Sequence, residues 1–294
     1  MFYRRKVILA VLQCFGGSLG KTQLQKLLLL FTKKQEKQDY YFVPYKYGCY
    51  SFQAAMDIST MQKYGQVEVT NKGIEKKDPV DYISLLKEKD RTSLKNLFIV
   101  HGKKSYADLI KYTYTHYPYF AIHSEIAERY LSPEELQEVV RYKPSASKTI
   151  LYTIGYEGIT LEQYLNNLIG KDVQVLVDVR NNPMSMKYGF TKSQLLKACN
   201  SVGIQYMHFP EVGIISEQRQ ELKCQTDYDS LFAKYRQETL QHTLSTQETI
   251  LKLLQDKKRI ALTCFEANIC QCHRKHLADA IQRLPNWKYE LIHL

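Results

Sequence analysis

Residues 173–180 read Val173-Gln-Val-Leu-Val-Asp-Val-Arg180, an apolar run that ends in charge. A strand that is buried on both faces has this composition, and such strands are typical of parallel sheets. Similar apolar runs alternate with segments of helical periodicity over residues 148–294. This alternation predicts an α/β domain with a mostly parallel open sheet, whose binding site lies at the carboxyl ends of the strands.

The other elements of this domain follow from the same two periodicities. Thr160 and Thr191 are suitable N-caps for two of the expected helices. Apart from 173–180, we expect strands at 149–155, 204–209, 259–265 and 287–293, and helices at 160–168, 191–202, 227–243, 247–255 and 274–284.

Chemically active side chains follow four of the expected strands. Because the carboxyl ends of parallel strands meet at one edge of a sheet, we expect these side chains to form one pocket that favours negative charge. We predict that Asp178, Glu266, Cys272 and His273 are catalytic, and that Arg180, Arg274, Tyr156, Glu211 and Cys264 bind the substrate or its anionic group.

The segment Cys272-His273-Arg274 lies at the start of an expected helix. Free backbone amides at a helix start attract anions, and the Arg274 guanidinium offers two parallel donors to a phosphate. A thiol at a helix start beside a histidine and an arginine is expected to have a lowered pKa. Cys272 is then a candidate nucleophile, and Glu266 is a candidate acid or base beside the anion.

Other interpretations of these residues stay open. Asp178 and Arg180 share one face of a strand and could form a structural ion pair. Cys264 could be a buried core thiol. A lone histidine that ends a strand, such as His208, is more often packed than catalytic.

The cysteines and histidines of residues 264–276 raise the question of a metal. Structural zinc sites usually have two ligand pairs, each about two to four residues apart. Cys270 and Cys272 are too close for a regular zinc knuckle, although His273 and His276 share one helical face. We predict no cofactor and keep zinc as the alternative.

Four segments of this half carry a resemblance. They are Tyr152–Gly158, Leu176–Ser185, Gly203–Gly213, and Leu262–Glu266 followed by Cys272-His-Arg274. In this order and spacing they resemble the family called domain of unknown function 488. The sequence departs from the family pattern at Met186, where a basic residue is common, and at Val212 and Ile214. The resemblance leaves the activity open and implies that the characteristic site consists of Asp178, Arg180, Pro183, Glu211, Cys264, Glu266, Cys272, His273 and Arg274.

Residues 1–143 show mainly helical periodicity and are predicted to form a separate domain, with the α/β domain beginning at residue 148. Helices are expected at 7–15, 22–34 and 51–64, with a turn at 16–20 and a hairpin at 65–76. This order resembles a winged helix-turn-helix module in which the hairpin is the wing. Residues 80–140 look helical, including 103–118 and 124–130, and extend this module.

The formal net charge is +11, and the excess of Lys and Arg lies mainly in residues 1–147. Clustered cations on a folded module indicate a polyanionic partner. The helix at 22–34 could enter the major groove of DNA, but four consecutive leucines at 27–30 favour a buried helix. A packing or homodimerisation module is therefore the alternative. The candidate nucleic-acid contacts are Lys21, Lys26, Lys72, Lys76 and Lys77.

The motifs also narrow the classes of function. The sequence contains neither Gly-x-x-x-x-Gly-Lys-Ser/Thr nor Gly-x-Gly-x-x-Gly, which disfavours ATPases and dinucleotide oxidoreductases. No apolar run approaches the roughly 18 residues of a membrane span, and the seven cysteines do not resemble a disulfide framework, so we expect a cytoplasmic protein with reduced thiols. We expect a hydrolase or group transferase that acts on a phosphate-bearing substrate, either nucleic acid or a nucleotide. The alternatives are a non-catalytic DNA-binding regulator or nucleotide sensor, and a cysteine-based redox or sulfur-transfer protein.

Overall fold

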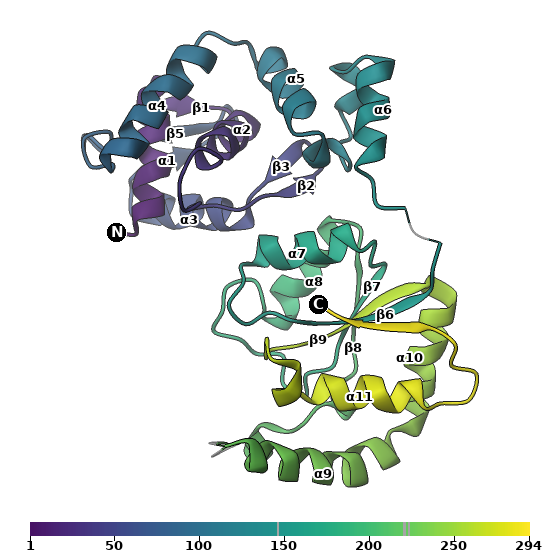
Figure 1. Ribbon diagram of the computed structural model, residues 1–294. Helices are drawn as coiled ribbons and strands as arrows, with labels where there is room; N and C mark the ends of the chain where they lie inside the picture. Colours follow the sequence, from purple (N-terminus) through teal and green to yellow (C-terminus); the bar gives the residue numbers. More distant parts are fainter. Residues whose placement is uncertain (146, 220–221, 223) are drawn as a thin grey trace. The chain divides into compact units, whose positions relative to one another are not determined.

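The computed structural model describes residues 1–294 except 146, 220–221 and 223. The chain forms two compact units, Met1–Lys143 and Pro144–Leu294, which we call the N-terminal unit and the C-terminal unit (Figure 1). Among the described residues, no helix combines the length and the apolar character that crossing a bilayer requires.

The C-terminal unit is built on one sheet of five parallel strands in the order β10-β6-β9-β7-β8. Every residue of β6 and β7 is buried. The prediction of a mostly parallel α/β sheet is therefore confirmed. The strands are β6 (Ile150–Gly155), β7 (Val175–Asp178), β8 (Gln205–His208), β9 (Arg259–Cys264) and β10 (Glu290–His293).

Helices cover both faces of this sheet. In Figure 1, α7 and α8 lie on one face, and α9, α10 and α11 lie on the other. The hydroxyl of Thr160 caps α7 by accepting the backbone N–H of Gln163, as the sequence pattern predicts. The helices are α7 (Leu161–Gly170), α8 (Lys192–Ser201), α9 (Gln225–His242), α10 (Leu244–Lys257) and α11 (His273–Gln282), with short 3-10 turns at Pro210–Val212, Ser216–Arg219 and Ile269–Gln271.

The direction in which the chain crosses this sheet changes between β6 and β9. After β6 the chain moves through α7 toward β7, and after β9 it moves through α11 toward β10, on the opposite side. Adjacent strands whose connections leave on opposite faces separate at their carboxyl ends, which is where open α/β sheets bind ligands. A ligand site is therefore expected at the loops that follow β6 and β9.

The N-terminal unit combines helices with a small antiparallel sheet in the order β1-β5-β4. A separate hairpin, β2–β3, connects α2 to α3. The elements are α1 (Tyr3–Cys14), β1 (Ser18–Leu19), α2 (Lys21–Thr32), β2 (Val43–Tyr45), β3 (Gly48–Tyr50), α3 (Phe52–Lys63), β4 (Val67–Val69) and β5 (Ile74–Lys76).

Further helices complete this unit. The expected helix at 103–118 is α5, which begins with a capping box between Ser105 and Asp108. The expected helix at 124–130 is wrong, because only a 3-10 turn forms at Ala127–Arg129. The Ser124 hydroxyl accepts the N–H of Ile126, and such local bonds compete with a helix start. The helices are α4 (Glu88–His101), α5 (Tyr106–His116) and α6 (Pro133–Arg141), with another 3-10 turn at Pro118–Ala121.

Candidate functional site

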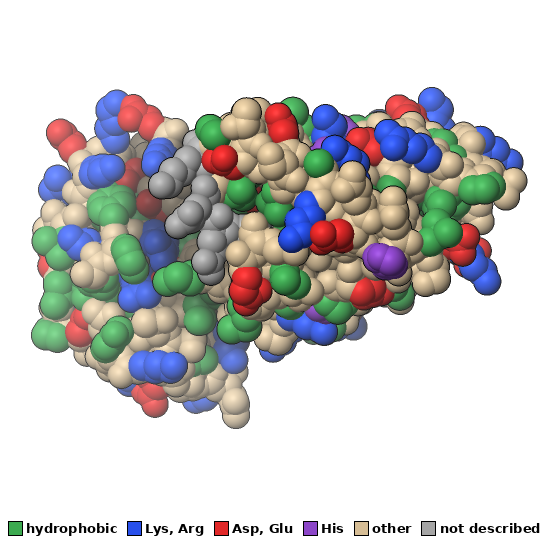
Figure 2. All heavy atoms as spheres, turned by 90° about the horizontal axis from the view of Figure 1, so that it is seen from below, with side chains coloured by type: hydrophobic (Ala, Val, Ile, Leu, Met, Phe, Trp, Pro, Cys, Tyr) green, Lys and Arg blue, Asp and Glu red, His purple; other side chains and the backbone are tan. Residues whose placement is uncertain are grey.

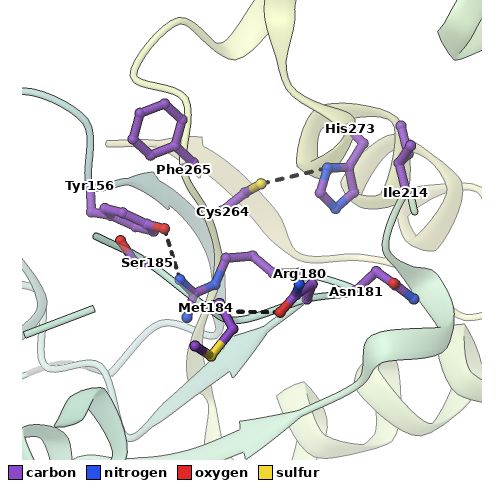
Figure 3. A pocket seen from close by; sticks show the side chains of 10 residues that line it. Tyr156, Arg180, Asn181, Met184, Ser185, Ile214, Cys264, Phe265 and His273 are labelled. Atoms are coloured by element: carbon purple, nitrogen blue, oxygen red, sulfur yellow. Dashed lines mark hydrogen bonds between the residues drawn. The ribbon is translucent and has the colours of Figure 1, made fainter. Parts of the chain in front are cut away.

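A cavity of about 270 Å³ opens at the carboxyl ends of the strands in the C-terminal unit. Its walls come from the loops after β6, β7 and β8, from the end of β9 and from the start of α11 (Figure 3). The cavity thus lies at the edge of the sheet where open α/β folds bind their ligands. Its lining residues are Tyr156, Arg180, Asn181, Asn182, Met184, Ser185, Ile214, Cys264, Phe265 and His273.

Asp178 and Arg180 form a buried ion pair at this cavity. Arg180 Nε donates to Asp178 Oδ1 at 2.8 Å, and Nη2 donates to Oδ2 at 2.5 Å. The hydroxyl of Tyr206 also donates to Asp178, at 2.6 Å. Burial opposes the charge of Arg180, but the hydrogen bonds to Asp178, the charge of Asp178 and the contact with Tyr156 together outweigh it and raise the pKa of Arg180. Asp178 therefore holds a permanent cation in place, as the structural interpretation of this pair expects.

Most of the donors of Arg180 bind the protein itself. Its Nη1 donates to the Tyr156 hydroxyl and to the Phe190 carbonyl, each at 2.8 Å. The Tyr156 ring stacks on Phe190 with centroids 4.2 Å apart. Arg180 thus fixes the aromatic wall of the cavity, and little of its guanidinium is left for a phosphate.

Cys264 and His273 face one another across the inner wall (Figure 3). Cys264 Sγ lies 3.6 Å from His273 Nδ1, and His273 Nε2 lies 3.0 Å from the carbonyl oxygen of Val179. A carbonyl oxygen only accepts, so Nε2 carries the proton and the Nδ1 lone pair faces the thiol. Cys264 Sγ also lies 3.1 Å from a carboxylate oxygen of Glu266. A thiol, an imidazole and a carboxylate therefore meet at one point of the cavity wall.

Cys272 differs from the expectation for a reactive thiol. It is the N-cap of α11 but is 0% exposed, and it does not line the cavity. Burial, followed by the neighbouring Cys264 and Glu266, raises the pKa of Cys272 well above its ordinary value, while Arg274 opposes the shift. The prediction of a lowered pKa is wrong, because enclosure of the sulfur outweighs its place at a helix start.

Arg274 does not offer its guanidinium to the cavity. The side chain is 0% exposed, and it donates to the backbone carbonyls of Glu266 and Ala267, the latter at 3.3 Å. Arg274 therefore binds the loop that follows β9 in place of the expected bidentate contact with a phosphate. We call its hydrogen bonds to these two carbonyls the Arg274 clamp. This clamp places Glu266 beside Cys264.

The remaining predicted residues of this unit lie outside the cavity. Glu211 is exposed and accepts the hydroxyl of Thr246 at 2.9 Å. His208 Nε2 contacts the carbonyl oxygen of Arg180 at 2.8 Å, which is a packing role. His276 packs on the Phe232 ring rather than facing His273 Nδ1, and Cys270 is exposed.

Sequence reasoning missed several polar residues of the cavity. Asn181, Asn182 and Ser185 lie in the loop after β7, and Lys187 follows them. The Lys187 ammonium donates to the carbonyl of Tyr156 at 2.6 Å, and burial lowers the pKa of Lys187. The pair Asn-Asn before a proline is the one signal that could have marked this loop, since a turn there keeps amide groups at the strand end.

The five candidate lysines of the N-terminal unit have different environments. Lys26 is 0% exposed, donates to the Tyr47 carbonyl at 3.0 Å and has its pKa lowered by burial. Lys26 therefore offers no exposed ammonium group to nucleic acid, and the rest of α2 from Leu24 to Thr32 is buried as well. Lys76 and Lys77 form ion pairs, with Asp78 and with Glu68 and Glu75 respectively. Lys21 and Lys72 are exposed.

Comparison with known protein families gives a partial match. The profile of the family described as Domain of unknown function DUF488 matches residues 160–281. The matched segment runs from the N-cap of α7 to α11 and contains the ion pair and the Cys264–His273 wall. No curated protein and no solved structure matched the chain.

Proposed function

We propose that the C-terminal unit is an enzyme, a hydrolase or group transferase, that acts on a nucleotide or on nucleic acid. The observation that carries this proposal is the Cys264–His273 pair at the wall of a cavity at the strand ends. A histidine whose tautomer is fixed by a carbonyl and whose other ring nitrogen faces a thiol is suited to proton transfer. Glu266 adds a carboxylate beside the same thiol at 3.1 Å.

The lining of the cavity supports a nucleotide as the substrate. Phe265 offers exposed aromatic surface, and Asn181 and Asn182 offer amide groups that both donate and accept. Flat heterocycles are held between apolar side chains and are recognised at their edges by amides. Since Arg180 and Arg274 are occupied by the protein, recognition rests on the base more than on the phosphate.

We also propose that the N-terminal unit binds DNA as a winged helix. The β4–β5 hairpin follows α3, which is the order that the sequence pattern suggests, and β1 joins this hairpin in a three-stranded sheet. Because α2 is buried, α3 and the β4–β5 hairpin are the elements available for contact. On the face drawn in Figure 2, Lys and Arg side chains are interspersed with Asp and Glu. Lys76 and Lys77 already form ion pairs with carboxylates, so few phosphate contacts would be left to the hairpin.

Product analysis tests the enzymatic proposal. The full chain is incubated with mono- and triphosphate nucleotides and with single- and double-stranded oligonucleotides, and products are identified by mass spectrometry. We expect turnover by the wild type and a loss of at least about a hundredfold in Cys264→Ser and His273→Gln. Cys270→Ser, which changes an exposed thiol six residues away, is the matched control and should keep the wild-type rate. Nucleotide binding without any product would favour a sensor instead.

A salt series tests the DNA proposal. We expect Lys72→Ala to weaken duplex binding for all sequences and to reduce the dependence of log K on log salt by about one. Lys89→Ala removes one exposed lysine that pairs with Glu36 on another part of this unit, and it should leave the slope unchanged. Equal slopes for both variants would contradict contact through the β4–β5 hairpin.

A further inference from the structure

Two thiols and one imidazole meet behind the cavity wall. The sulfur atoms of Cys264 and Cys272 and a ring nitrogen of His273 lie within 4.8 Å of one another. Cys264 and His273 are 1% exposed, and Cys272 is 0% exposed. Among the described residues, these three are the His, Cys, Asp or Glu side chains placed closely enough to share one metal ion.

We propose that Cys264, Cys272 and His273 bind one transition-metal ion of the zinc class at the edge of the cavity. This inference rests on the proposed function, because it assigns the reactive group of the same site: with a metal bound, Cys264 and His273 serve as its ligands, and the metal takes the place of the thiol–imidazole pair as the reactive group. Thiolate and imidazole are ligands that zinc prefers, and two cysteines with one histidine form a set that leaves a fourth position for water or substrate. The spacing of these three ligands along the chain does not resemble a zinc motif, since Cys264 ends a strand while Cys272 and His273 start a helix.

The contacts of His273 support metal ligation. Its Nε2 is bound to the Val179 carbonyl at 3.0 Å, so the lone pair of Nδ1 faces Cys264. A histidine that ligates a metal usually gives its other N–H to a carbonyl or carboxylate, which fixes the ring. The ring is thus held in the orientation and tautomer that a metal requires.

The geometry also assigns the fourth position. Cys264 and His273 line the cavity, whereas Cys272 lies outside its lining. An ion held by the three ligands therefore has its remaining position toward the cavity, where a substrate would lie. Glu266, whose carboxylate is 3.1 Å from Cys264 Sγ, lies beside this ligand and, like Cys272, outside the lining of the cavity.

The charge of the two cysteine ligands also favours a bound divalent ion. Isolated thiolates are costly to bury, and Cys264 and Cys272 are only 1% and 0% exposed. A divalent ion balances two thiolates, so the complete centre would be neutral. The Arg274 clamp on the loop after β9 holds Glu266 next to this centre without entering it.

Metal analysis of the full chain, purified under reducing and anaerobic conditions, tests this inference. We expect one zinc per chain, and we expect Co²⁺ added to the metal-free protein to give a thiolate-to-cobalt charge-transfer band. Cys264→Ser, Cys272→Ser and His273→Gln should lose stoichiometric metal, and Glu266→Gln should weaken metal affinity about 10- to 100-fold. Cys270→Ser and His276→Gln, which alter neighbouring side chains outside the cluster, should bind like the wild type.

Circular dichroism separates loss of metal from loss of folding, and Co²⁺ titration of the wild type needs no variant. A wild type that takes up no metal, or a disulfide between Cys264 and Cys272 in the freshly purified protein, would overturn the inference. Turnover of a nucleotide by metal-free protein would overturn it while leaving the proposed function intact. Stoichiometric metal without turnover of any nucleotide would support the metal site and contradict the proposed function.

Discussion

The ion pair of Asp178 and Arg180 shows how a single carboxylate organises the cavity. Asp178 is 0% exposed and accepts hydrogen bonds from Arg180 and Tyr206. Breaking a buried pair by removing one partner leaves an uncompensated charge, which costs far more than the pair contributes. The pair is therefore a point at which stability and cavity shape are coupled.

We expect Asp178→Ala to lower the free energy of unfolding by about 3–5 kcal/mol. Urea unfolding followed by the fluorescence of Trp287, the single tryptophan, reports on this unit. Glu238→Ala removes one partner of the exposed pair with Lys234 and should change stability by less than about 1 kcal/mol. Equal effects of the two variants would show that Asp178 does not confine Arg180.

Gly155 allows the ends of β6 and β9 to approach one another. A Cβ at this position would lie 2.0 Å from the backbone oxygen of Glu266. We expect Gly155→Ala to destabilise the C-terminal unit by about 1–3 kcal/mol or more and to displace the loop that carries Glu266. Gly170→Ala, where a Cβ meets nothing within 4 Å, is the control and should be neutral in the same unfolding experiment.

The sequence predicts the site well where a strand carries the residue. Tyr156, Arg180 and Cys264 lie at the cavity because a parallel sheet brings the ends of its strands together. It fails for Cys272 and Arg274, because being at a helix start does not determine whether a side chain is enclosed. Contacts with backbone carbonyls, such as those of Arg274, have no signature in the sequence.

At the scale of elements, apolar runs were the reliable signals, whereas of the two expected caps Thr160 makes a side-chain capping hydrogen bond and Thr191 makes none. The buried strands β6 and β7 and the capped helix α7 follow from local pattern alone. The two-residue strand β1 was missed, since its pairing with β5 depends on residues far along the chain. The four leucines of α2 favour a buried helix, and α2 is buried from Leu24 to Thr32, so it offers little surface to a partner.

The end of α4 provides a pH test. His101 is 7% exposed, and its Nδ1 has no hydrogen-bond partner among the described residues. Burial, then the charges of Lys104 and His116, lower the pKa of His101. In the unfolded chain, His101 has its ordinary pKa of 6.5, so it becomes protonated at pH values at which it stays neutral in the folded chain. As far as His101 is concerned, the folded chain therefore has its full stability above about pH 6.5. Its free energy of unfolding decreases as the pH falls toward the lower pKa that His101 has in the folded chain.

We expect His101→Leu to reduce the loss of thermal stability between about pH 7.5 and about pH 5.5. The unfolding midpoint of the full chain, measured by circular dichroism at both values, checks this. His242→Leu replaces an exposed histidine in the C-terminal unit and should leave the pH dependence unchanged. A steeper dependence in the His101 variant would contradict a lowered pKa of His101 in the folded chain.

At the scale of the molecule, the chain joins a basic unit to a unit with a cavity at the ends of its strands. The formal net charge of +11 favours association with polyanions, and the cavity is lined mostly by neutral polar and aromatic groups. We propose that charge brings nucleic acid to the protein, while the cavity selects a base. The fold class and the family resemblance could be predicted from the sequence. The separate roles of charge and cavity could be proposed only after the structure showed how Arg180, Arg274 and Lys26 are enclosed.

The most direct test of the central claim is a crystal structure of the full chain with a bound nucleoside monophosphate. We expect the base to lie in the cavity, within hydrogen-bonding distance of Asn181 or Asn182 and in contact with the wall formed by Cys264 and His273. A nucleotide bound elsewhere, with the cavity empty, would contradict the claim.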